Sequence, residues 1–79
     1  MQPANLNDRS PGARIYALLK KRGGWVSNVE IVRETSVIAP STWVSSIRKR
    51  LELEHWRGEC VPPSRVINGV HHYRVEQVG

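Results

Sequence analysis

The stretch Pro40–Glu54, with the sequence PSTWVSSIRKRLELE, constrains the fold of this chain more than any other segment. Proline suits the first turn of a helix, because its missing N–H leaves no hydrogen bond unmade there. At about 100° per residue, Val44, Ile47 and Leu51 fall on one narrow apolar stripe. We therefore predict a helix over residues 40–54 that buries this stripe against a core.

The helix face opposite this stripe carries short hydroxyls followed by long cations. Its members are Thr42, Ser45, Ser46 and Lys49, with Arg50 on the flank. An ordinary exposed face favours Ala, Glu, Lys and Gln, because Ser and Thr are weaker helix formers. Short side chains let a helix approach a partner closely, and hydroxyls can hydrogen-bond to a base edge or a phosphate. The alternative is a solvated face whose cations, at residues 48–50, complement the C-terminal helix dipole.

Length and charge narrow the class of protein. The 79 residues allow one domain with a single small core. Twelve Lys and Arg against seven Asp and Glu give a net charge of +5, which indicates an anionic partner such as nucleic acid. We expect no membrane partner, because no apolar run approaches the length of a span. One cysteine and a start without signal-peptide character favour the cytoplasm.

The chain begins with a polar stretch and a helix. Residues 1–9 lack periodicity and are expected to form a flexible N-terminal arm, which leaves residues 10–79 as the domain. Ser10 and Pro11 form an N-cap and first helical position, and Gly23 provides a left-handed stop. The apolar positions between them are Ile15, Leu18 and Leu19, with Tyr16 at the edge.

A second, short helix follows from a capping box. In Ser27-Asn28-Val29-Glu30, the serine side chain and the glutamate each satisfy a backbone N–H of the other. We predict a helix from Asn28 to Thr35 with Ile31 and Val32 toward the core, preceded by a short stretch at Trp25 that pairs with a sheet edge. Residues 36–39 then form a turn before the helix over 40–54, which gives a helix-turn-helix arrangement.

The last part of the chain favours strands. Asn68-Gly69 suits a type I′ hairpin turn, so Ile67 should lie opposite Val70. Arg65 then pairs with His72, and the Pro62-Pro63 pair indicates a bulge, kink or edge. Alternation divides the hairpin between an apolar and a basic face. The apolar face holds Tyr73 and Val75, and the basic face holds Arg65, His72 and Arg74.

This order of elements resembles the winged helix-turn-helix domain, in particular the small single-domain versions of bacteria and their phages. The residues that carry the resemblance are Gly-Trp-Val-Ser after the first helix, Ser-Thr-Trp-Val-Ser-Ser-Ile-Arg-Lys-Arg-Leu in the third, and Asn-Gly-Val-His-His-Tyr-Arg-Val in the last strand. The resemblance implies an α+β fold of three helices with a C-terminal β-hairpin wing. It also implies that the third helix enters the major groove and that the wing contacts the backbone or minor groove.

Carried over to this chain, the resemblance implies sequence-specific binding of double-stranded DNA by a small transcriptional regulator or a recombination or replication accessory protein. The DNA-binding positions would be Thr42, Ser45, Ser46, Lys49 and Arg50 on the helix, with Arg65, His72 and Arg74 on the wing. One recognition helix reads few base pairs, so we expect a free monomer that pairs as a homodimer on DNA.

Other functions find less support in the sequence. The possible metal ligands are His55, Cys60, His71 and His72. Structural zinc sites favour closer ligand pairs, and adjacent histidines on a strand point to opposite faces, so we predict no metal and a half-buried Cys60. Without a glycine-rich phosphate loop or an orienting group beside Cys60, we expect no enzyme, cofactor or small-molecule substrate. The remaining alternative is a protein-interaction module that uses the Trp43 face or the hairpin edge.

Overall fold

The computed structural model describes residues 10–54 and 58–77. Its helices are α1 (Pro11–Arg22), α2 (Asn28–Thr35) and α3 (Pro40–Glu54). Its strands are β1 (Val26–Ser27), β2 (Glu59–Cys60), β3 (Arg65–Ile67), β4 (Val70–Tyr73) and β5 (Glu76–Gln77). The predicted α+β class, with three helices and a C-terminal β-hairpin, is confirmed.

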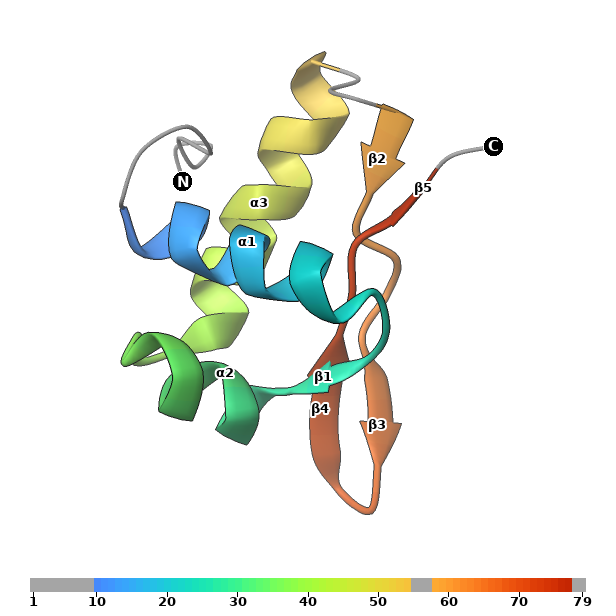
Figure 1. The fold of residues 1–79 in the computed structure, drawn as a ribbon. Helices are drawn as coiled ribbons and strands as arrows, with labels where there is room; N and C mark the ends of the chain where they lie inside the picture. The colour runs from blue at the N-terminus through green and yellow to red at the C-terminus, as the bar shows by residue number, and fades with distance from the viewer. Residues whose placement is uncertain (1–9, 55–57, 78–79) are drawn as a thin grey trace.

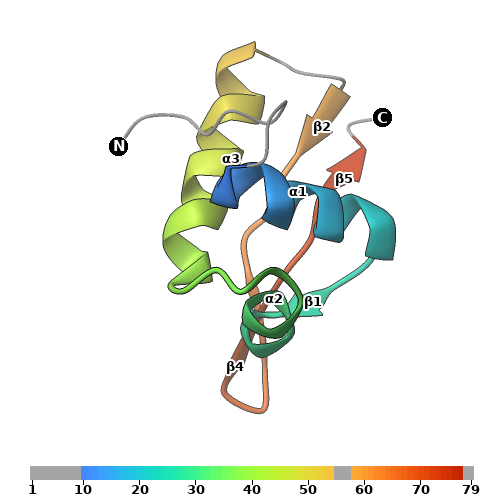
Figure 2. The same cartoon turned by 60° about the vertical axis from the view of Figure 1, so that its left-hand side comes forward.

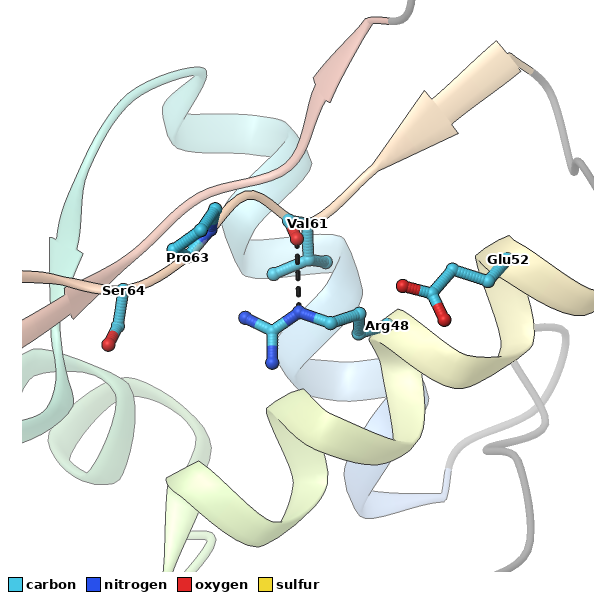
Figure 3. Close-up of a pocket in the computed structure, with 5 residues that line it drawn as sticks. All are labelled: Arg48, Glu52, Val61, Pro63 and Ser64. Carbon is cyan, nitrogen blue, oxygen red and sulfur yellow. Dashed lines mark hydrogen bonds between the residues drawn. The ribbon is translucent and has the colours of Figure 1, made fainter.

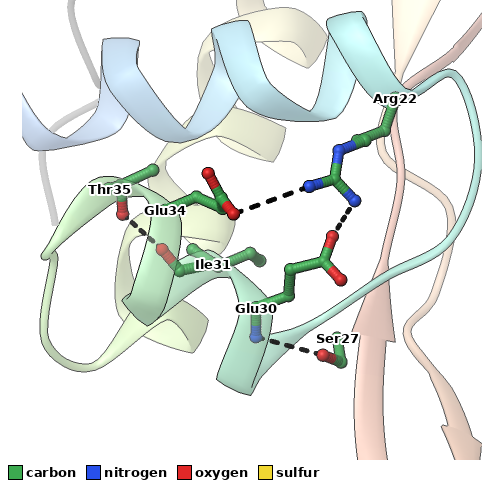
Figure 4. Close-up of polar contacts among 6 residues, drawn as sticks. All are labelled: Arg22, Ser27, Glu30, Ile31, Glu34 and Thr35. Carbon is green, nitrogen blue, oxygen red and sulfur yellow. Dashed lines mark hydrogen bonds and ion pairs between the residues drawn. The ribbon is translucent and has the colours of Figure 1, made fainter.

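The serine caps of α1 and α2 form as predicted, whereas the Glu30 carboxylate, expected to accept from the Ser27 N–H, accepts from Arg22 instead. The Ser10 hydroxyl accepts from a backbone N–H of the first turn of α1, and Gly23 ends that helix at φ +68°. The Ser27 hydroxyl accepts from the Glu30 N–H at 3.1 Å (Figure 4). Ser36, at φ +60°, closes α2 in the left-handed conformation. Local side chains therefore set the lengths of both helices.

The core lies between the three helices and the strands, with α1 crossing α3 (Figure 1). Its buried members are Ile15, Tyr16, Leu19, Val26, Ile31, Val37, Val44, Ile47, Leu51, Val61, Tyr73 and Val75. The apolar stripe of α3 is therefore confirmed. Ile31 is buried as predicted, but Val32, also predicted to face the core, is 38% exposed. Tyr16, placed at the edge of the apolar face of its helix, is buried inside the core.

The hairpin forms in the predicted register, with Ile67 opposite Val70 and Arg65 opposite His72. β1 pairs with the other edge of β4, so the sheet order is β1-β4-β3. The hairpin projects beyond the helices in two views (Figures 1 and 2). A second sheet, in which β2 pairs with β5, was not predicted. Residues 61–64, which include both prolines, lie outside the strands and join the two sheets.

Some expectations concern residues without described positions. The N-terminal arm at residues 1–9 and the possible metal ligand His55 fall outside the described ranges. None of the helices at residues 10–54 combines the length and apolar character needed to cross a bilayer.

Candidate nucleic-acid interface

The exposed face of α3 retains most of the polar residues predicted there. Thr42, Ser45 and Lys49 are exposed. Glu52, which follows Lys49 by three positions and Ser45 by seven, is exposed on the same face. The sequence interpretation omitted Glu52, although helical spacing places it there. This surface therefore combines hydroxyls with a cation and a carboxylate.

Ser46 does not belong to that face. It is 3% exposed, so the expectation that it lies on the exposed face of the helix is wrong. The buried arc of α3 is wider than the apolar stripe, because Trp43 and Arg50, one turn before and after Ser46, are half-buried on the same flank. A small serine can be enclosed on such a flank. Arg50 lies on the flank as predicted, and it is less accessible than Lys49.

Arg48 connects the edge of this face to the segment between β2 and β3 (Figure 3). Its Nε donates to the carbonyl of Val61 at 3.0 Å, and its Nη2 donates to the carbonyl of Pro62 at 3.1 Å. An open groove of about 510 Å³ lies beside these bonds. Its lining comprises Arg48, Glu52, Val61, Pro63 and Ser64. The groove therefore joins the exposed face of α3 to the residue that precedes β3.

The sequence contains a signal for Arg48 that the prediction did not use. Arg48 follows Val44 by four positions and precedes Leu51 by three, so it flanks the buried stripe. A long cation in that place can extend along the border of the core with its stem covered. Which carbonyls it meets could not be predicted, because the path of residues 61–64 depends on the pairing of β2 with β5.

The three basic positions predicted on the hairpin have different surroundings. Arg65 is exposed and makes no ion pair within the described part of the chain. His72 is half-buried, with its Nδ1 at 2.8 Å from the Val70 carbonyl. Arg74 is half-buried, with its guanidinium 5.6 Å from the centre of the Trp25 ring and its Nε 3.7 Å from a Glu76 oxygen. Arg65 is thus the most available of the three.

Two of the three cations in the last turn of α1, Lys20 and Arg22, are bound within the fold. The Nη1 atom of Arg22 pairs with the Glu30 carboxylate, and its Nη2 atom lies 3.8 Å from a carboxylate oxygen of Glu34 (Figure 4). Lys20 pairs with Glu59 of β2. These two side chains therefore connect α1 with β2 and with α2.

Glu59 is a buried carboxylate that sequence reasoning missed. It is 3% exposed and accepts hydrogen bonds from the Tyr16 hydroxyl and from Lys20. Gln77 of β5 donates to it at 3.3 Å. The sequence gives no signal for this burial, because Glu59 lies in a two-residue strand and its partners come from distant segments. The network joins α1 to the second sheet.

Metal ligation can be assessed only for part of the predicted set. Within residues 10–54 and 58–77, His, Cys, Asp and Glu form no group of three that could hold a metal ion. The Cys60 thiol is half-buried, as expected. His71 is exposed, with its Nδ1 3.4 Å from the Ser64 hydroxyl.

The chain matches no protein-family model, no curated protein and no solved structure. An inference about function therefore depends on the arrangement of these side chains.

Proposed function

We propose that this chain belongs to the winged helix-turn-helix family and binds double-stranded DNA through α3 and the β3–β4 wing. The distribution of charge carries the proposal. Lys20 and Arg22 of α1 are paired with carboxylates, whereas Lys49 of α3 and Arg65 of the wing have no ion pair among the described residues. Unpaired cations remain available to phosphates, and phosphate contacts supply most non-specific affinity.

The side chains on α3 then divide between two kinds of contact. Thr42 and Ser45 are short and exposed, and in the major groove their hydroxyls would meet base edges or bridging water. Lys49 is long enough to contact phosphate or a guanine edge. Glu52 repels phosphates but can accept a hydrogen bond from the amino group of cytosine, so it favours docking that places it over the bases. Ser46 has no part in this proposal.

The wing contributes mainly through Arg65. His72 and Arg74 have partners within the fold, so we assign them a smaller share of the phosphate contacts. Arg50 on the flank of α3 can reach phosphate only with the exposed part of its side chain. In the cell, the role we propose is that of a cytoplasmic transcriptional regulator or a recombination or replication accessory protein.

The proposal is tested by charge removal from α3, the wing and α1. Lys49→Ala and Arg65→Ala should each reduce the steepness of the fall of log affinity with log salt by about one unit on random duplex DNA. Lys21→Ala is the matched control, because Lys21 is exposed on α1 and its loss changes the net charge equally. We expect Lys21→Ala to leave the slope nearly unchanged. Parent binding that does not respond to salt would contradict the proposal.

We further propose that two copies bind DNA together, because a single α3 covers only part of a typical site. The free chain is expected to be a monomer. Light scattering should give the monomer mass without DNA and a complex with two chains on a palindromic duplex. A stable dimer in the absence of DNA would contradict this order of assembly.

The rival function is protein interaction through the outer edge of β3. One observation favours it: Val66 is 56% exposed and Ile67 is also exposed on this edge strand. Protein interaction through the face around Trp43 has less support, because Trp43 is half-buried and packs against the core. The salt titration separates the two functions, since binding of a protein at an apolar edge need not release counterions.

A further inference from the structure

Residues 61–64, between β2 and β3, determine where the wing begins. This segment pairs with no strand among the described residues, and its two prolines have no N–H to donate. It therefore needs support from side chains. Arg48 of α3 provides such support at two successive carbonyls, that of Val61 (Figure 3) and that of Pro62.

We propose that Arg48 is a positioning residue that fixes the direction of the β3–β4 wing relative to α3. The inference rests on the proposed DNA-binding function and assigns Arg48 no contact with DNA. A planar guanidinium that donates from Nε and Nη2 restrains both distance and orientation, because the two donors are held in one rigid group. Its effect is to align Arg65 of the wing with the exposed face of α3.

The geometry explains why such a restraint matters. Arg65 follows Ser64 directly, and Ser64 lines the same groove as Arg48. β3 pairs only with β4 in the described sheet, so its other edge is open. β1 holds the base of β4, where Val26 lies opposite Tyr73. The start of β3 is held by the prolines and by Arg48, and a shift there changes the direction of the projecting hairpin.

The first test is a double-mutant cycle of DNA affinity with Arg48→Lys and Arg65→Ala. Lysine keeps the charge but cannot donate from a rigid planar fork. We expect Arg65→Ala to weaken binding by about three- to tenfold in the parent and by less than twofold in the Arg48→Lys background. Arg33→Lys, the same exchange at an exposed position of α2, should leave the effect of Arg65→Ala intact. Equal losses in all backgrounds would overturn the inference.

The second test needs no DNA. Spin labels at Ser45→Cys on α3 and Val66→Cys on β3, in a Cys60→Ser background, report the distance between the recognition face and the wing. We expect one narrow distance distribution with Arg48 present and a clearly broader one with Arg48→Lys. If Arg48→Lys fails to fold, Arg48→Gln replaces it. This variant keeps one amide donor in place of the two guanidinium donors, and it should also broaden the distribution relative to the parent.

The two tests separate failure of the inference from failure of the proposed function. An unchanged distance distribution in a folded Arg48 variant would overturn the positioning role, whatever the affinity for DNA. A parent chain that fails to bind DNA would instead overturn the proposed function. The alignment of Arg65 with the exposed face of α3 would then have no role in DNA binding. A broader distribution together with a reduced effect of Arg65→Ala in the Arg48→Lys background would support both.

Discussion

The α1–α2 side of the molecule and the α3–wing side carry similar charged residues but use them differently. On the first side, Arg22 pairs with Glu30 and Glu34, and Lys20 reaches the buried Glu59. On the second, Lys49 and Arg65 have no acidic partner within the described ranges. The acidic residues thus pair with Lys20 and Arg22 and leave Lys49 and Arg65 unpaired. Lys21 and Arg33 are also exposed and lack an ion pair within the described ranges, so the α1–α2 side keeps part of its positive charge.

This difference indicates which cations belong to the fold and which are available to a partner. Paired cations stabilise the contact between elements but attract an external anion weakly, because a nearby carboxylate cancels their field. Unpaired cations attract an external anion more strongly and contribute less to the contacts between elements. The net charge of +5 is therefore less informative than the location of its unpaired part. Variants that change stability on one side and DNA affinity on the other test this difference.

The largest effect is expected from Ile47→Ala, because the core is common to both sides. Ile47 is fully buried, and its truncation should lower the free energy of unfolding by about 2–5 kcal/mol through lost burial and a residual cavity. Urea unfolding measures this loss. Leu53→Ala, at an exposed position of the same helix, is the control and should change stability by less than about 0.5 kcal/mol. Similar values for both would mean that α3 is not anchored by its apolar stripe.

Glu59→Ala should come next and should act on stability alone. Its removal leaves the buried Tyr16 hydroxyl without its acceptor, at a cost of about 1–3 kcal/mol. The cost from Lys20 is smaller, because that side chain is 39% exposed and water can solvate it. Thermal or urea unfolding measures the loss. The slope of DNA affinity against salt should stay at the parent value.

Glu52→Ala is the matched control for Glu59→Ala, because it removes an exposed carboxylate from α3. We expect it to change stability by less than about 0.5 kcal/mol. A loss of stability as large as that of Glu59→Ala would break the distinction between the structural and the available charges.

The sequence predicted those features that depend on local signals. The caps at Ser10 and Ser27, the turn at Asn68-Gly69 and the apolar stripe of α3 each follow from nearby residues, and all are present. The exposure of Thr42, Ser45 and Lys49 followed from the same helical period.

Features that depend on distant segments were not predicted. Ser46 is buried because the packing against α3 extends around one flank of the helix. A helical wheel does not show how much of the helix surface the neighbouring elements cover. Glu59 is buried because α1 and β5 supply its hydrogen-bond donors. The role of Arg48 likewise depends on carbonyls that lie 13 and 14 residues further along the chain.

The smallest effect is expected from Arg22→Ala, which tests how strongly the paired charges hold α1 to α2. The Arg22 side chain is 42% exposed, so water and salt screen its interactions with Glu30 and Glu34. We expect a loss of about 0.2–1 kcal/mol at low salt that shrinks as salt is added. A double-mutant cycle with Glu30→Ala isolates the pair, and Arg33→Ala serves as an exposed control on α2. A coupling energy that exceeds this range, or that persists in high salt, would show that these pairs anchor the two helices. If the coupling is small, the main consequence of the pairing is electrostatic, because the carboxylates of Glu30 and Glu34 cancel the field of Arg22 and so reduce the free positive charge on the α1–α2 side.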